Sequence, residues 1–128
     1  MPASPVRVLV VDDDVESTEV LSLLLQRRGH QVRVAHDVDA ALQIALDFKP
    51  DVALLDIMIR CESGYFLARE LHALPDLRNC RLVAMTGFSQ PQHRRASEAA
   101  GLHRHLTKPI DAVELFDAIE APPSAAEG

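Results

Sequence analysis

The amino-acid sequence predicts one α/β domain, in which a five-stranded parallel sheet carries helices on both faces in a doubly wound order. Two observations predict this fold. Apolar runs typical of strands that are covered on both faces alternate along the chain with segments of helical periodicity. Several of these runs end in charged or hydroxyl residues, at the place where open α/β sheets bind their ligands. Right-handed crossovers between successive strand-helix units would complete the doubly wound sheet.

The strand predictions rest on apolar runs and on alternation. The segment 52–55 is a continuous apolar run that ends at Asp56, and the segment 6–11 is a similar run before Asp12. The segment 31–35 alternates instead, which is typical of a less buried strand. The predicted strands comprise residues 6–11, 31–35, 52–55, 81–85 and 103–107.

Apolar residues at helical spacing predict a helix after each strand. The predicted helical segments include residues 20–25, 38–48, 65–71, 89–100 and 111–120. Gly29 is a natural C-cap for the first helix, and Asp111 is a natural N-cap for the last. The apolar residues expected on the inner faces include Val20, Leu21, Leu24, Leu25, Ala41, Leu42, Ala45, Leu46, Val113, Leu115, Phe116 and Ile119.

Composition predicts an ordinary globular domain over residues 6–120, with an extension at 1–5 and a disordered tail at 121–128. The 128 residues are 48% hydrophobic and 25% charged, and no apolar run approaches the about 20 residues that span a bilayer. The net charge of −6 argues against direct nucleic-acid binding, because phosphate neutralisation needs a basic face. Cys61 and Cys80 lack metal-ligand spacing, which favours a reducing cytoplasm.

Polar side chains stand at the ends of four predicted strands. Asp12 and Asp13 follow the first strand, Asp56 ends the third, Thr86 follows the fourth and Lys108 follows the fifth. The carboxyl ends of parallel strands meet at one edge of a sheet, so these groups are expected to converge there. The sequence therefore predicts a site at this edge.

Five motifs mark these strand ends in a characteristic order. They are Val-Leu-Val-Val-Asp12-Asp13-Asp14, Leu-Leu-Asp56, Gly64, Met85-Thr86-Gly87 and Lys108-Pro109. With them the chain resembles response-regulator receiver domains of two-component signalling, from Val6 to about Ile119. Met-Thr-Gly-Phe, Arg94-Arg95, Ala99-Ala100-Gly101 and His105-Leu-Thr-Lys-Pro are also similar to receivers attached to hybrid histidine kinases. The resemblance implies a flavodoxin-like fold and a signalling module that turns over no external substrate.

The resemblance assigns roles to the residues at the predicted site. Asp56 would accept a phosphoryl group from the phosphohistidine of a histidine kinase or phosphotransfer protein. Asp13, Asp56 and the backbone carbonyl of Met58 would bind Mg²⁺ (or Mn²⁺) directly, with Asp12 acting through water. Neighbouring carboxylates repel one another strongly, which a divalent cation would offset. Lys108 would neutralise the oxygens of the transferred group.

The resemblance also implies a switch. A phosphoryl group adds about −1.5 to −2 charges, and the Thr86 hydroxyl would donate to it while His105 moves into the vacated space. The output surface would be the fourth helix, fifth strand and fifth helix, which would bind an unidentified partner or form a phosphorylation-dependent dimer. A cis peptide between Lys108 and Pro109 would aim the lysine into the pocket.

Simpler interpretations of these residues are also open. Asp14, or the whole acidic run that contains it, can serve as the negatively charged start of a helix. Thr86 can be a turn hydroxyl, and His105 a strand-end histidine without a switching role. His103 and His105 share one strand face, but a zinc site there lacks further Cys or His partners. The remaining histidines are predicted to lie at the surface.

Two other functional classes remain open. Arg60 and Ser63 stand where receivers usually carry Pro and Asp, so a pseudo-receiver that binds a partner without phosphorylation stays an alternative. Asp12-x-Asp14 after the first strand resembles the signature of haloacid-dehalogenase-type hydrolases, which act on aspartyl phosphates. That alternative leaves Asp56 unexplained.

Overall fold

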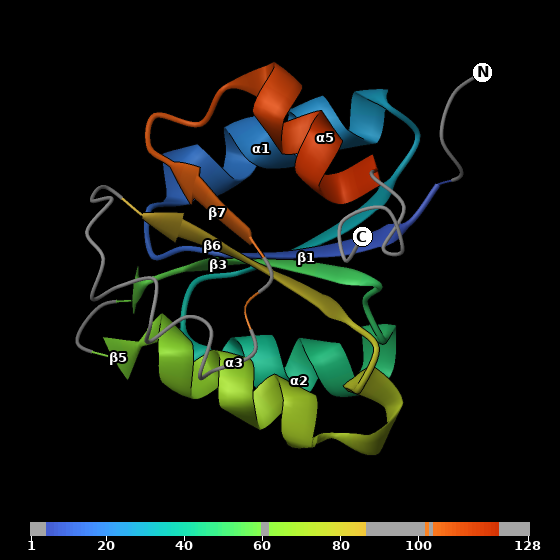
Figure 1. Cartoon of the computed structure of the whole chain (residues 1–128), viewed down its shortest axis with the longest axis vertical. Coiled ribbons are helices and arrows are strands. Elements are labelled where there is room, and N and C mark those ends of the chain that lie inside the picture. Colours follow the sequence, from blue (N-terminus) through green and yellow to red (C-terminus); the bar gives the residue numbers. More distant parts are fainter. Residues whose placement is uncertain (1–4, 60–61, 87–101, 103, 121–128) are drawn as a thin grey trace.

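The computed structural model describes residues 5–59, 62–86, 102 and 104–120, and its centre is a five-stranded sheet (Figure 1). The strands of this sheet are β1 (Arg7–Val11), β2 (Gln31–Ala35), β3 (Val52–Asp56), β6 (Arg81–Thr86) and β7 (Arg104–Thr107). Their order is β2-β1-β3-β6-β7, and each neighbouring pair is parallel. The predicted fold class is confirmed.

Helices cover both faces of this sheet. The described helices are α1 (Val15–Arg27), α2 (Val38–Phe48), α3 (Gly64–Ala73), α5 (Ala112–Glu120) and the short 3-10 helix η1 (Pro75–Leu77). Figure 1 shows α1 and α5 on one face and α2 and α3 on the other. A small antiparallel hairpin, β4 (Met58–Ile59) and β5 (Glu62–Ser63), follows β3. The predicted helix at 89–100 lies outside the described residues. None of the helices that the structure describes has the length and apolar character of a membrane span.

The structure describes both predicted helix ends, and it shifts the C-cap of the first helix from Gly29 to the preceding residue. The helix α1 is capped by Arg28, and Gly29 then adopts φ +92°, a left-handed conformation that glycine tolerates without strain. At the other end of the chain, the Asp111 carboxylate accepts the Glu114 backbone N–H at 3.1 Å. This is the N-cap interaction predicted for the last helix.

The core consists of two apolar layers, one on each side of the sheet, because successive residues of a strand point to opposite faces. Leu9 and Leu55 belong to the layer under α2 and α3, whereas Val10 and Leu54 belong to the layer under α1 and α5. All five residues of β3 are buried. Both faces of the central strands are therefore dry, which explains why their sequences are continuously apolar rather than alternating.

Some residues predicted on inner helix faces are exposed. Val20 on α1 is 57% exposed, Leu46 on α2 is 56% exposed and Val113 on α5 is 74% exposed. Helical spacing alone does not fix the width of the buried stripe, and these residues lie at its margins.

The prediction that His30 lies at the surface is wrong. His30 is 4% exposed, and its Nδ1 accepts the Val6 backbone N–H at 3.1 Å. Its Nε2 lies 2.9 Å from a carboxylate oxygen of Glu120. The Glu120 carboxylate also forms an ion pair with Arg28. The partners of His30 are remote in sequence, and therefore no local pattern indicated its burial.

Replacement of Leu54 by alanine tests the importance of the core. Leu54 is fully buried, and we expect Leu54→Ala to lower the free energy of unfolding by about 3 kcal/mol through lost burial and a residual cavity. Leu23 on α1 is 57% exposed, and Leu23→Ala is expected to cost less than about 1 kcal/mol. Urea denaturation measures both values, and equal losses in the two variants would contradict the assignment of the core.

Candidate functional site

The parallel register brings the ends of the central strands to one edge of the sheet. Asp56, the last residue of β3, lies opposite Met85, and Thr86 lies opposite Thr107 of β7. Asp12 immediately follows β1, and its backbone N–H still bonds to the Ala35 carbonyl at 3.2 Å. Side chains from four strand ends are thus held at one edge by the backbone ladder.

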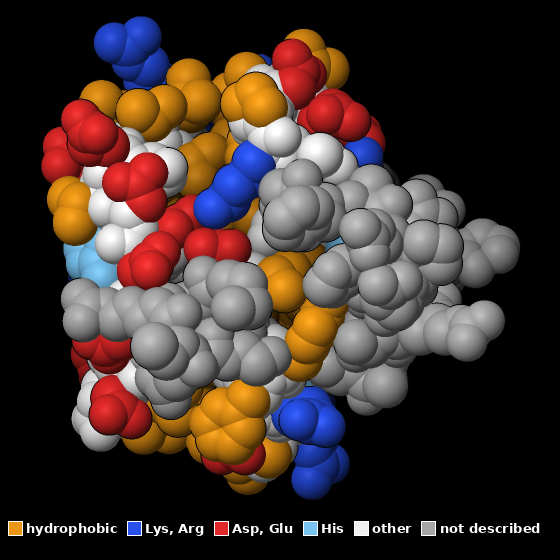
Figure 2. Space-filling view, turned by 90° about the vertical axis from the view of Figure 1, so that its left-hand side faces the viewer, with side chains coloured by type: hydrophobic (Ala, Val, Ile, Leu, Met, Phe, Trp, Pro, Cys, Tyr) orange, Lys and Arg blue, Asp and Glu red, His pale blue; other side chains and the backbone are white. Residues whose placement is uncertain are grey.

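Three carboxylates gather at this edge. Oxygen atoms of Asp12, Asp13 and Asp56 all lie within 4.8 Å of one another. Asp12 is 1% exposed and Asp56 is 7% exposed, whereas Asp13 is exposed to solvent. Figure 2 looks onto this edge and shows acidic side chains side by side with a basic side chain against them. Burial weakens the screening of the Asp12 and Asp56 charges by water, so the cluster needs cations close by.

Lys108 supplies one of the cations that the cluster needs. Its ammonium nitrogen lies 2.9 Å from Asp12 Oδ2 and 3.4 Å from Asp56 Oδ2. Partial burial opposes the charged form, but the hydrogen bond to Asp12 and the charges of both aspartates outweigh it and raise the pKa of Lys108. Its backbone N–H donates to the Thr86 carbonyl at 2.8 Å, and the peptide bond to Pro109 is cis, as the resemblance implied. Lys108 therefore stays protonated at neutral pH.

The donor set fits a hard divalent cation. Each of the three clustered side chains offers carboxylate oxygen, the ligand type that Mg²⁺ and Ca²⁺ prefer. Lys108 balances one of the three negative charges, which leaves two for a divalent ion. Among the described residues, the side chains close enough together to bind a metal ion are these three aspartates and not histidines.

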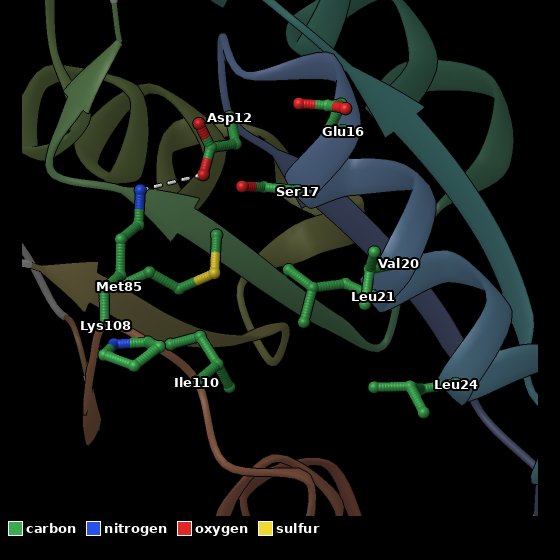
Figure 3. Close-up of a pocket in the computed structure, with 10 residues that line it drawn as sticks. Asp12, Glu16, Ser17, Val20, Leu21, Leu24, Met85, Lys108 and Ile110 are labelled. Carbon is green, nitrogen blue, oxygen red and sulfur yellow. Dashed lines mark hydrogen bonds and ion pairs between the residues drawn. The ribbon is translucent and has the colours of Figure 1, made fainter.

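An open apolar groove adjoins the acidic cluster. It encloses about 550 Å³ between α1 and the segment Lys108, Pro109 and Ile110 (Figure 3). The residues that line it are Asp12, Glu16, Ser17, Val20, Leu21, Leu24, Met85, Lys108, Pro109 and Ile110. Sequence patterns did not reveal this groove, because they assign the apolar residues of α1 to the core.

Three other predicted site residues, Met58, Thr86 and His105, lie among the described residues. Met58 begins β4, two residues beyond Asp56, and the role of its carbonyl stays a prediction. Thr86 is 4% exposed at the end of β6, and His105 is half-buried on β7 opposite Ala84. Their switching roles also stay predictions. Arg60 and His103 lie outside the described residues.

Comparison with known proteins identifies the family to which this fold and site belong. The model of the response regulator receiver domain matches residues 8–120. The chain therefore belongs to the response-regulator receiver family of two-component signalling. Receiver domains interact with histidine kinases and output domains, and they generally bind Mg²⁺ at an acidic pocket.

The chain is similar to several individual members of this family. It is 30% identical to the protein PilH of Pseudomonas aeruginosa, over 90% of this chain and 95% of PilH. It is 34% identical to the response regulator PleD of Caulobacter vibrioides over 86% of this chain, but it spans 24% of PleD. A solved response regulator from Burkholderia pseudomallei superposes with a TM-score of 0.83 at 26% identity, over 94% of this chain and 70% of that one.

Neutralising one carboxylate tests the repulsion within the cluster. In a metal chelator, we expect Asp13→Asn to raise the free energy of unfolding by on the order of 1 kcal/mol, because two close negative pairs disappear. The matched control is Glu70→Gln, which removes a charge from the exposed surface of α3 and should change stability by less than about 0.5 kcal/mol. Urea denaturation measures both, and a destabilised Asp13→Asn protein would show that repulsion is already fully compensated.

Proposed function

We propose that Asp56 accepts a phosphoryl group from the phosphohistidine of a histidine kinase or phosphotransfer protein. The observation that supports this function best is the position of Asp56, at the end of a fully buried strand and 3.4 Å from the Lys108 ammonium. This arrangement combines a carboxylate nucleophile with a fixed cation for the incoming anion. Phosphoryl transfer depends mainly on such positioning and charge stabilisation.

In the proposed step, one Asp56 carboxylate oxygen bonds to phosphorus while the phosphorus–nitrogen bond of the donor breaks. The bonding pair stays on the donor nitrogen, which leaves as neutral imidazole when its other ring nitrogen carries a proton. The product is an acyl phosphate on Asp56. Lys108 holds a positive charge beside the transferred oxygens, and its raised pKa keeps that charge in place through the step.

Asp13, Asp56 and the backbone carbonyl of Met58 are the proposed direct ligands of Mg²⁺ or Mn²⁺, and Asp12 would act through water. When bound, the cation would offset the negative charge shared by the carboxylates and the phosphoryl group. The three carboxylates within 4.8 Å of one another support this assignment. The structure of the Burkholderia pseudomallei relative contains a phosphorylated aspartic acid and a calcium ion, which also supports it.

The proposed output is a changed protein-binding surface. The buried Thr86 hydroxyl would donate to the phosphoryl group and His105 would reposition, which would alter the surface of β7 and α5. The predicted helix at 89–100, which the proposal also assigns to this surface, lies outside the described residues. That surface would bind an output partner or a second phosphorylated copy. The module would catalyse only its own phosphorylation and dephosphorylation. The proposed histidine-kinase donor favours the cytoplasm.

The first experiment is intact mass spectrometry after incubation with acetyl phosphate and Mg²⁺. We expect the mass of one added phosphoryl group, and we expect it to disappear in Asp56→Asn and in the presence of a metal chelator. Asp47→Asn is the matched control, because Asp47 is exposed on α2 and should leave labelling unchanged.

Other outcomes of this experiment separate the alternatives. Labelling that survives Asp56→Asn and disappears in Asp12→Asn would favour the aspartyl-phosphate hydrolase. Labelling neither by acetyl phosphate nor by a phosphorylated histidine phosphotransfer protein would favour the pseudo-receiver.

The two lysines of the chain offer a second test. Lys108→Gln removes the cation beside Asp56, and we expect the rate of labelling by acetyl phosphate to fall at least about tenfold. Lys49 lies after α2 and pairs with Asp76 at 3.5 Å, so Lys49→Gln should keep the wild-type rate. Rates are read from the mass spectra over time. Equal rates in both variants would remove Lys108 from the proposed machinery.

A further inference from the structure

The side of α1 that faces away from the sheet carries a line of four exposed residues. The buried residues of this helix are Thr18, Leu21 and Leu25, which lie on the side toward the core. On the opposite side, residues spaced by four, three and four positions follow one another along the helix. We name this line the α1 stripe, and its members are Glu16, Val20, Leu23 and Arg27.

The middle of the α1 stripe is apolar. Val20 and Leu23 are each 57% exposed. Val20 also borders the open groove of about 550 Å³, together with the partly buried Leu24 and Ile110 (Figure 3). Single exposed apolar residues are ordinary on a protein surface, but these two are adjacent on one side of a helix and continue into an apolar groove. A continuous apolar surface of this kind favours a contact with another protein.

Opposite charges stand at the two ends of the α1 stripe. Glu16 lies in the first turn of the helix and Arg27 in the last. Among the described residues, the ion pairs involve neither of these side chains. In the sequence, Glu16 and Arg27 have the same midpoint as Val20 and Leu23. A two-fold axis through this midpoint would therefore relate each acidic end to a basic end.

This order of residues is self-complementary for antiparallel helices. If α1 of a second copy lay antiparallel across the stripe, Glu16 of each copy would face Arg27 of the other. Val20 of each copy would face Leu23 of the other in the same contact. A parallel arrangement would instead place Glu16 against Glu16 and Arg27 against Arg27. Like charges that face each other across a contact repel, so the charges select the antiparallel arrangement.

We propose that the α1 stripe is the contact surface of a homodimer, in which the α1 helices of two copies pack antiparallel about a two-fold axis. The stripe contains no residue of the acidic cluster, so this dimer forms in the unphosphorylated protein and does not rest on the proposed function. It is also distinct from the surface of β7 and α5. A contact of two apolar pairs and two ion pairs is small, and the expected dissociation constant is on the order of 100 µM.

Sedimentation equilibrium of the unphosphorylated full chain, at concentrations up to about 1 mM, tests the dimer. We expect a monomer–dimer equilibrium, and we expect Leu23→Ala to weaken it at least about fivefold because the contact loses apolar area in both copies. The matched control is Leu46→Ala, since Leu46 is 56% exposed on α2, on the other face of the sheet, and should leave the equilibrium unchanged (Figure 1). Equal weakening in both variants would overturn the proposal. So would a wild-type chain that stays monomeric, which would leave the stripe to a helix of another protein.

Charge reversal tests the pairing of the two helices. Arg27→Glu creates two pairs of facing negative charges in the proposed dimer, and Glu16→Arg creates two pairs of facing positive charges. We expect each variant alone to associate at least about tenfold more weakly than the wild-type chain. An equimolar mixture of the two variants restores both ion pairs in a mixed dimer, so the mixture should regain the wild-type affinity.

Two control variants separate this pairing from the effect of net charge. Arg69→Glu and Glu70→Arg make the same changes in net charge at exposed positions of α3, and they should dimerise as the wild-type chain does. Weaker association in these controls as well would assign the effect to net charge. A mixture of the two stripe variants that stays monomeric would show that Glu16 and Arg27 serve only the dipole of α1. Either result would overturn the proposed contact.

Discussion

The organisation of this domain depends on the balance of charge between Lys108 and the aspartates beside it. Burial of Asp12 and Asp56 is tolerated because an ammonium group lies within 3.4 Å of both. Under the proposed function, the same balance would suit the site to an incoming anion, because a bound cation would lie close to Asp56. The burial of the two aspartates and the proposed chemistry of the site therefore both depend on the positive charge of Lys108.

The parallel sheet makes this charge balance achievable. Each central strand is short and largely buried on both faces, so the polar residue at its carboxyl end marks the point where the chain leaves the core. Because neighbouring strands are parallel and in register, these exit points meet at one edge. A residue placed there is held by a rigid backbone ladder on one side and can face solvent on the other. Such a scaffold positions reactive groups without flexible loops.

The sequence predicted the features that depend on local patterns. Apolar runs located the buried strands, and the polar residues at the strand ends included Asp56 and Lys108. Features that depend on pairing across the fold were not predictable in this way. His30 and Glu120 are 90 residues apart, so the burial of the histidine has no local signal. Val20 has helical spacing typical of a core position, yet it lines an open groove because none of the described elements covers it.

The contact between Val6 and His30 has a consequence for where a further domain could be attached. Val6 precedes β1 and Glu120 ends α5, and both bind one histidine ring. The points where the backbone enters and leaves the fold are thus neighbours, at the amino ends of the strands. An attached domain on either side would meet the fold there and leave the opposite, acidic edge open to a phosphodonor. Connections to other domains would thus lie at the amino ends of the strands, and the acidic cluster lies at their carboxyl ends.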